Sequence, residues 1–296
     1  NFYISNPLIE LYKNIPTYDD AVINNLPLAT SEIQQTLSNL GWGERILTKN
    51  QLRNISQIAN LPAAADFSIP GAGKTTEAIA INTLRKKSPE DRTLIICPKN
   101  AFTAWEEDIP ICLSTNNKLI SLKGDILNIE KLLKKNASFY MINYERLRQI
   151  GVDGKPSYAL LIADFISKPE YNFSIIADES HRMKGFKTSE VMQILAPLTH
   201  NKMVLSGTPC PQSHQDLISQ FRFLYPKEHF INAEDIAIKF QPIFVRTTKD
   251  DLKDELPKLR EEYKSINYSG TLKDVHDLFK GVIINNKFNL NDRNDL

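Results

Sequence analysis

Ser68-Ile69-Pro70-Gly71-Ala72-Gly73-Lys74-Thr75 is the stretch of this sequence that decides the fold. It lies between the apolar run 63–67, which is typical of a buried strand, and the segment 75–86, whose apolar residues have helical spacing. A strand, a glycine-rich turn and a helix in this order are typical of a phosphate-binding loop. In such a loop the backbone N–H groups surround the phosphates, the lysine reaches the β and γ oxygens, and the threonine hydroxyl binds Mg²⁺.

The match to the usual loop pattern is incomplete, because Ser68 stands where that pattern begins with glycine. A glycine-rich turn in front of a helix is therefore the alternative interpretation. If the loop does bind phosphate, the ligand is a nucleoside triphosphate, and we expect ATP with Mg²⁺. The residues expected to contact it are Pro70, Gly71, Ala72, Gly73, Lys74, Thr75 and Thr76.

Length and composition are those of an ordinary globular protein. With 296 residues, 42% of them hydrophobic and 24% charged, the chain is long enough for one large α/β domain or two smaller ones. The 36 Lys and Arg residues nearly balance the 35 Asp and Glu residues, which leaves a formal charge of +1. Because no overall basic field exists, a surface that binds nucleic acid must be local.

The cellular compartment is indicated by the cysteines and by the absence of long apolar runs. Cys97, Cys112 and Cys210 are odd in number and lack paired spacing, which argues for a reducing compartment and against a disulfide framework or a zinc knuckle. No apolar run approaches the roughly 18 residues of a membrane span. We therefore predict a cytoplasmic protein, nuclear if eukaryotic, without a membrane partner. The sequence lacks an initial Met, so we expect a fragment of a longer protein.

Strand-like and helix-like segments alternate along the middle of the chain, as an open parallel sheet requires. We expect strands at 63–67, 93–97, 118–122, 139–142, 173–177 and 203–205, and helices at 75–86, 125–135 and 158–166. The predicted fold class is α/β, a mostly parallel sheet flanked by helices. The predicted domains are a helical N-terminal extension (1–45), an ATP-binding lobe (46–226), and a helical extension that begins a linker (227–296).

Two adjacent carboxylates, Asp178 and Glu179, follow the apolar strand at 173–177. In phosphoryl transfer such a pair divides the work: Asp178 would bind Mg²⁺, directly or through water, and Glu179 would orient and activate the attacking water. The alternative is that the acidic pair only caps a helix starting at Ser180. With Lys74 in the same sheet, the catalytic interpretation is favoured, and Lys74, Asp178 and Glu179 are the predicted catalytic residues.

Val204-Leu205-Ser206-Gly207-Thr208-Pro209 follows another apolar strand. Its hydroxyls can bond to the acidic motif, in which case Ser206 and Thr208 would couple the nucleotide state to the rest of the molecule. The alternative is an ordinary Ser-Gly turn stiffened by proline. We expect His181 to bond to Ser206 or Thr208 rather than to ligate a metal. For Trp105, its spacing on an apolar helix face favours core packing over base stacking.

The order of these motifs resembles the first motor lobe of superfamily-two helicases, and among them the Swi/Snf-type ATPases. The resemblance runs from about Leu47 to Pro257. The segments that carry it are Leu47–Gln51, which is similar to an adenine-recognising segment; 94–107, similar to "CPxSLxxNWxxE"; 139–147, similar to "ITTYExL"; 178–185, similar to "DEGHRLKN"; 205–209, similar to "LTGTP"; 216–226, similar to "ELWSLLNFLNP"; and 244–257, similar to "FMLRRTKxDVxxxLP".

The resemblance implies a DNA-dependent ATPase, and it assigns further residues. Gln51 would face the adenine base, and the loops carrying Lys99, Asn100 and Arg146 would contact the DNA backbone, with double-stranded DNA as the partner. For the three contact residues the alternative is an ordinary solvated surface. Arg182 and Lys184 are further candidates at the same sheet edge.

The departures from the family pattern mark a divergent member. The family's "DEMGLGKT" begins with an acidic residue that is absent before this loop, and a single Arg246-Thr247 replaces a double arginine. The resemblance also implies a second RecA-like lobe, for which residues 258–296 are too few. We therefore expect this piece alone to bind ATP but hydrolyse it weakly. Two other functions stay open: a nucleotide-gated binding module, and a P-loop kinase or small transferase, disfavoured because no acceptor pocket is evident.

Overall fold

The structure is a computed structural model that describes residues 10, 12–114, 117–149, 158–168, 170–228, 231–253 and 273–277. The chain divides into two compact units, Asn1–Asp254 and Glu255–Leu296. Of the second unit, the described residues 273–277 are helical. All that follows concerns the first unit.

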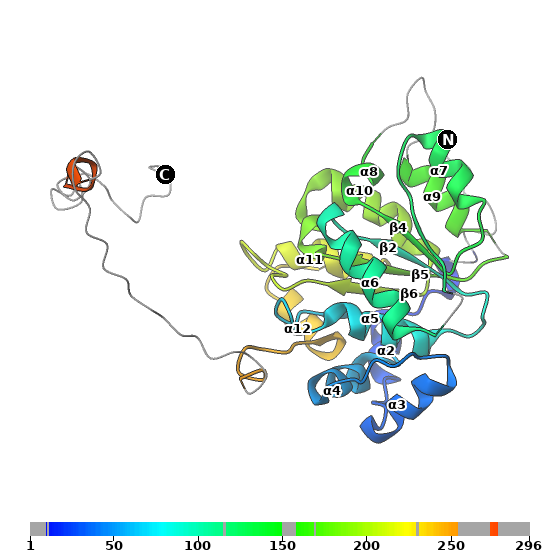
Figure 1. Ribbon diagram of the computed structural model, residues 1–296, viewed down its shortest axis with the longest axis horizontal. Coiled ribbons are helices and arrows are strands. Elements are labelled where there is room, and N and C mark those ends of the chain that lie inside the picture. Colours follow the sequence, from blue (N-terminus) through cyan, green and yellow to red (C-terminus); the bar gives the residue numbers. More distant parts are fainter. Residues whose placement is uncertain are drawn as a thin grey trace. The chain divides into compact units, whose positions relative to one another are not determined.

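A parallel sheet forms the centre of the first unit (Figure 1). Its seven strands lie in the order β3-β4-β2-β5-β6-β1-β7, and every pairing is parallel. The strands are β1 Ala63–Asp66, β2 Arg92–Ile96, β3 Leu119–Ser121, β4 Phe139–Ile142, β5 Phe173–Asp178, β6 Asn201–Leu205 and β7 Phe244–Val245. Four of them, β1, β2, β4 and β5, are buried along their whole length, as expected of strands covered on both faces.

Helices cover both faces of this sheet (Figure 1). They are α2 Tyr18–Ile23, α3 Thr30–Asn39, α4 Lys49–Ile58, α5 Lys74–Arg85, α6 Phe102–Cys112, α7 Ile126–Leu133, α8 Tyr144–Leu147, α9 Tyr158–Ile166, α10 Phe186–Leu195, α11 Asp216–Leu224 and α12 Ile236–Phe240. From β1 to β3 the chain moves across the sheet in one direction, so right-handed crossovers place α5 and α6 on one face. From β3 to β6 the chain moves back toward β1, so the same handedness places α7, α9 and α10 on the other face. In agreement, α5 packs against α4 and α6, and α10 packs against α9 and α11.

The direction of the strands places the candidate motifs at one edge of the sheet. The carboxyl ends of β5, β6 and β1 are neighbours, and they lead into the acidic pair, the Ser206–Pro209 turn and the glycine-rich loop respectively. The carboxyl ends of β4 and β2 lead into Arg146 and Lys99. Ligands of open parallel sheets bind at this edge.

The predicted fold class is confirmed, and each strand expected from the sequence is present within one to two residues of its expected bounds. One strand was not expected. Residues 244–245 lie in the part predicted to be a helical extension, but they form β7, which pairs with β1 and is the sheet's last strand. A strand of two residues has no periodicity to detect. The domain boundaries at 45 and 226 stay a prediction.

One strand of the sheet carries a buried lysine near its amino end. Lys202, in β6, is 1% exposed, and its ammonium donates a hydrogen bond of 2.9 Å to the Ala196 carbonyl. Burial lowers the pKa of Lys202 to about 7. In an unfolded chain the pKa of lysine is about 10.4. Between these values the unfolded state therefore holds one more proton than the folded state, and the cost of burying Lys202 decreases as pH rises.

We predict that the unfolding free energy of the wild type, relative to Lys202→Met, rises by about 1.4 kcal/mol per pH unit between pH 7.5 and 9.5. Urea unfolding at several pH values measures this difference. The exposed Lys131→Met is the control, and its difference from the wild type should not change with pH. A constant difference for Lys202→Met would contradict the assignment.

Candidate functional site

The glycine-rich loop has the backbone that a phosphate-binding loop needs. Gly71 and Gly73 have φ values of 84° and 89°, in the left-handed region that favours glycine, and α5 begins directly afterwards at Lys74. A Cβ atom at Gly73 would also overlap the amide of Gln51. The first N–H groups of a helix have no partner within the helix, so an anion is favoured beside the loop at this helix start.

Lys74 is held by the loop itself. Its ammonium donates hydrogen bonds to the carbonyls of Ser68, at 2.9 Å, and Ile69, at 3.2 Å. Thr75 is half-buried, whereas the Thr76 side chain is buried and its hydroxyl accepts a hydrogen bond of 3.3 Å from Arg45. The Thr76 hydroxyl thus has a protein partner, and the predicted contact of Thr76 with the nucleotide stays a prediction.

Gln51 lies beside the loop because it caps its own helix. The side-chain oxygen of Gln51 accepts a hydrogen bond of 2.9 Å from Thr48 N, while its backbone N–H donates to the Thr48 hydroxyl. This reciprocal capping fixes the side chain at the start of α4. The remaining amide N–H group is 3.5 Å from the Gly73 carbonyl. The adenine role of Gln51 stays a prediction.

Asp178 ends β5 with both carboxylate oxygens bonded to the protein. One oxygen accepts the Trp105 indole N–H at 3.1 Å, and the other accepts the Glu179 backbone N–H at 2.8 Å. Burial raises the pKa of Asp178, and the Trp105 hydrogen bond opposes that rise. Trp105 is fully buried in α6, as predicted for a core residue, but its hydrogen bond to Asp178 was not foreseen.

Glu179 has a strained backbone. Among the described residues it is the one non-glycine residue with positive φ, at 51°, a conformation that clusters at functional sites. The turn leaves its side chain partly exposed, and its carboxylate lies 3.2 Å from His181 Nδ1. The same nitrogen is 3.1 Å from the Ser206 hydroxyl, so the expected contact between His181 and Ser206 is present.

The Ser206–Pro209 turn reaches both other loops. The Ser206 hydroxyl, besides its His181 contact, accepts the Thr208 backbone N–H at 3.2 Å. A Cβ atom at Gly207 would lie 2.8 Å from Pro70 Cδ, so glycine is needed for the turn to approach the glycine-rich loop. The Thr208 side chain is exposed. The structure therefore brings Ser206 to the acidic motif, and the coupling role of both hydroxyls stays a prediction.

The candidate DNA-contacting residues differ in their surroundings. Lys99 and Asn100 are exposed in a short 3₁₀ helix after β2. Arg146 is half-buried, contacts the Gln149 side chain at 3.3 Å and lies over the ring of Tyr158. Arg182 forms an ion pair of 2.7 Å with Glu145, which neutralises part of its charge. Lys99 and Asn100 thus remain the more available of these residues.

Metal binding would rest on few protein ligands. Within the described ranges, no group of three or more His, Cys, Asp or Glu residues could hold a metal ion. Mg²⁺ bound with a nucleotide takes one or two protein ligands, with phosphates and water supplying the rest, and the predicted ligands Thr75 and Asp178 stay a prediction. An oxygen of Asp178 that accepts one hydrogen bond still has a free lone pair for such a ligand.

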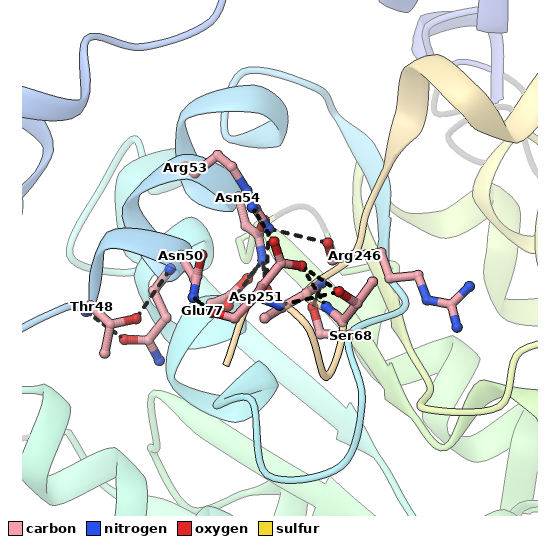
Figure 2. Close-up of polar contacts among 11 residues, drawn as sticks. Thr48, Asn50, Arg53, Asn54, Ser68, Glu77, Arg246 and Asp251 are labelled. Carbon is pink, nitrogen blue, oxygen red and sulfur yellow. Dashed lines mark hydrogen bonds and ion pairs between the residues drawn. The ribbon is translucent and has the colours of Figure 1, made fainter. Parts of the chain in front are cut away.

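Sequence reasoning missed a polar network behind the loop (Figure 2). Asn54, fully buried in α4, donates to the Glu77 carboxylate at 3.1 Å and to the Thr247 hydroxyl at 2.9 Å. Burial, together with the nearby Asp66 carboxyl, raises the pKa of Glu77 well above its ordinary value. Asp66 accepts the Ser68 N–H at 2.9 Å and so helps to start the loop. The sequence offered no distinct signal for Asn54, because the same helix also buries the polar side chains of Gln51 and Ser56.

The fold and site define a RecA-like P-loop domain of the superfamily-two helicase type. The family model for the SNF2-related domain matches residues 68–235. The chain therefore belongs to the SNF2-related family, the Swi/Snf-type ATPases, as its motifs predicted.

Curated relatives support the same family. A DNA repair and recombination protein RAD54-like of Drosophila persimilis is 24% identical over 62% of this chain and 24% of its own length. The chromatin-remodeling ATPase INO80 of Candida albicans is 25% identical over 73% of the chain and 16% of its own length. Human chromodomain-helicase-DNA-binding protein 1 is 22% identical over 89% of this chain and 16% of its own length. The chain spans a quarter or less of the length of these relatives.

Solved structures show the same fold. The SWI2/SNF2 ATPase core of Sulfolobus solfataricus in complex with double-stranded DNA matches with a TM-score of 0.53 and 19% identity, over 71% of this chain and 46% of that one. A second structure of the Sulfolobus solfataricus SWI2/SNF2 ATPase core domain matches with a TM-score of 0.51 and 18% identity, over 83% of this chain and 56% of that one. In the part of the chain that the structure describes, no helix is long and apolar enough to cross a membrane.

The loss of stability in Trp105→Phe, relative to the wild type, should depend on pH through the ionisation of Asp178. Without the indole donor the pKa of Asp178 rises further above its unfolded value, so the folded state binds more protons and loses stability as pH rises. We expect the loss of unfolding free energy in Trp105→Phe to be larger at pH 7 than at pH 4. In the Asp178→Asn background this difference should vanish. An equal loss at both pH values would contradict it.

Glu179→Gly should not destabilise the fold. A left-handed conformation costs a non-glycine residue roughly 1–2 kcal/mol, which offsets the greater freedom of glycine in the unfolded chain. The control is Glu190→Gly, at an exposed position within α10, where glycine should cost about 1 kcal/mol. Chemical denaturation compares the two variants. Equal losses would show that Glu179 stores no strain.

Proposed function

We propose that this chain is the ATP-binding first motor lobe of a DNA-dependent ATPase that acts in remodelling, repair or defence against foreign DNA. The observation that carries the proposal is the meeting of three loops at the carboxyl ends of β1, β5 and β6. Pro70 packs toward Gly207, and Ser206 contacts His181. The cation of Lys74 and the carboxylates of Asp178 and Glu179 thus belong to one edge of the sheet, where charge on a triphosphate would be neutralised.

Each residue of this edge has a role in the proposal. Lys74 exchanges its bonds to the Ser68 and Ile69 carbonyls for the β- and γ-phosphate oxygens of ATP. Thr75 and Asp178 hold Mg²⁺, which, when bound, neutralises charge on the phosphates. Glu179 orients the attacking water and accepts its proton. Its contact with His181 supports this role, because the imidazole holds the carboxylate in place and connects it to Ser206.

Double-stranded DNA is the proposed partner, bound along the β4–β2 side of the same edge. Lys99 and Asn100 lie in the 3₁₀ helix after β2, and Arg146 lies in α8 after β4, apart from the β1–β6 side where the nucleotide would bind. Phosphate contacts from such residues position a duplex without reading its sequence. The solved Swi/Snf core that this fold matches was described in complex with double-stranded DNA, which supports the proposal.

Full activity requires a second RecA-like lobe in this proposal. Arginines from another domain, which stabilise charge on the γ-phosphate, raise the rate by about 10³–10⁵ in related systems. The isolated lobe would hydrolyse ATP weakly. We keep the cytoplasm, or the nucleus of a eukaryote, as the proposed location.

The test uses the lobe joined to the C-terminal part of its own protein. DNA should stimulate ATP hydrolysis, and Glu179→Gln should lower the stimulated rate by at least about 100-fold, because the water loses its base. Glu190→Gln, on the exposed face of α10, is the matched control. Lys74→Ala should instead weaken ATP binding about 10- to 100-fold, because a charged hydrogen-bond donor is lost.

The outcomes separate the proposal from its alternatives. An unchanged rate in Glu179→Gln would remove Glu179 from the mechanism. ATP binding that needs Lys74 without DNA-stimulated hydrolysis would favour a nucleotide-gated binding module. Stimulation by RNA and not by DNA would favour another superfamily-two helicase.

A further inference from the structure

Residues 244–251, which we call the tether segment, run beside the glycine-rich loop. The segment begins as β7, where the Phe67 N–H donates to the Val245 carbonyl at 2.8 Å. Further on, the Ile69 N–H donates to the Thr247 carbonyl at 3.1 Å, and the Thr247 N–H donates to the Ser68 hydroxyl at 2.9 Å. Thr247 therefore bonds two successive residues of the loop, Ser68 through its N–H and Ile69 through its carbonyl.

Helix α4 holds the same segment from another direction (Figure 2). Asn54 donates to the Thr247 hydroxyl at 2.9 Å, and Arg53 donates to the Arg246 carbonyl at 3.2 Å. Arg53 also pairs with Asp251 at 3.3 Å. The Arg246 side chain points away from the cluster, so its backbone alone takes part (Figure 2). The tether segment is thus bonded to the loop and to the helix that carries Gln51.

Lys74 shares its partners with Thr247. Its ammonium bonds the Ser68 and Ile69 carbonyls, and the same two residues bond Thr247 through the Ser68 hydroxyl and the Ile69 N–H. A change in the partners of Lys74 would free the peptide groups of those residues. Because protein interiors are close-packed, reorientation of these peptide groups would change the hydrogen bonds and packing of Thr247.

Both departures from the family pattern fall on this contact. Counting back from Lys74 places the missing acidic residue at Ser68, and counting along the other block places the missing arginine at Thr247. Ser68 and Thr247 are both fully buried and bond each other. This chain therefore joins loop and tether with neutral groups.

We propose that Thr247 is a positioning residue for the nucleotide loop and that it links nucleotide binding to the tether segment. This inference rests on the proposed function. Binding of ATP at the loop would tighten the tether segment, and by reciprocity the attachment of Thr247 to Asn54 would strengthen ATP binding by the same factor. The segment leads to the chain beyond Lys253, so the state of the nucleotide would be passed to whatever follows there.

Thr247→Val tests the link, because valine keeps the shape and the backbone bonds but loses the hydroxyl that Asn54 binds. Amide hydrogen exchange of residues 67–69 and 244–251 is measured with and without ATP and Mg²⁺, alongside ATP affinity by titration. In the wild type we expect ATP to slow exchange of the Ile69 and Thr247 amides at least tenfold. In Thr247→Val we expect ATP to bind several-fold more weakly and this slowing to be lost.

Thr248→Val is the matched control, since the Thr248 hydroxyl bonds only Asp251 at 2.8 Å within the segment and should leave both readouts as in the wild type. Arg53→Met removes the contacts of Arg53 with the Arg246 carbonyl, with Asp251 and with the Thr247 hydroxyl but keeps the Asn54 bond, and it should shift both readouts in the same direction by a smaller factor. The Arg53→Met variant replaces Thr247→Val in this test if Thr247→Val does not fold.

A purely structural role for Thr247 would lower the thermal midpoint of Thr247→Val while leaving ATP affinity and ATP-dependent protection unchanged, and this result would overturn the inference. ATP binding to the wild type without slower exchange in 244–251 would also overturn it and leave the proposed function standing. A wild type that binds no ATP would contradict the proposed function itself.

Discussion

Parallel pairing of β1 with β6 on one side and β7 on the other is the constraint on which the rest of this structure depends. Because all strands run the same way, every strand delivers its loop to one edge. The loop after β1 is thereby flanked by the Ser206–Pro209 turn and by the tether segment. If β1 shifted by one residue, the alternation of its side chains would reverse, and the loop after β1 would lose its present alignment with its two neighbours.

Specific hydrogen-bond partners stabilise the carboxylates of Asp178 and Glu77 at this edge. Asp178 is nearly buried, and the Trp105 indole and the Glu179 N–H satisfy its oxygens. Glu77 is fully buried and accepts from Asn54. An unpartnered carboxylate in such surroundings would be strongly disfavoured. Glu179 differs from these residues, because its positive φ places strain at the residue that is proposed to activate water.

Much of the fold and part of the site were predictable from local patterns. Continuous apolar runs predicted β2, β4 and β5, and the glycine-rich stretch before a helical segment predicted the loop and α5. The contact between His181 and Ser206 followed from the nature of their motifs. Other features depend on distance in the sequence: Asn54 and Thr247 are 193 residues apart, and Trp105 and Asp178 are 73 apart. No spacing rule predicts such hydrogen bonds, because only the folded sheet brings the partners together. The φ angle of Glu179 has no sequence signal either, since glutamate is not a left-handed residue by preference.

The central claim is that a nucleoside triphosphate binds at the carboxyl ends of β1, β5 and β6. Backbone amide NMR during titration with ATP and Mg²⁺ measures the location directly. The account predicts the largest shifts at residues 71–76, with smaller ones at Glu179 and Ser206, and little change in β3 at the far end of the sheet. Saturating shifts confined to another surface, or no shifts at residues 71–76, would contradict it.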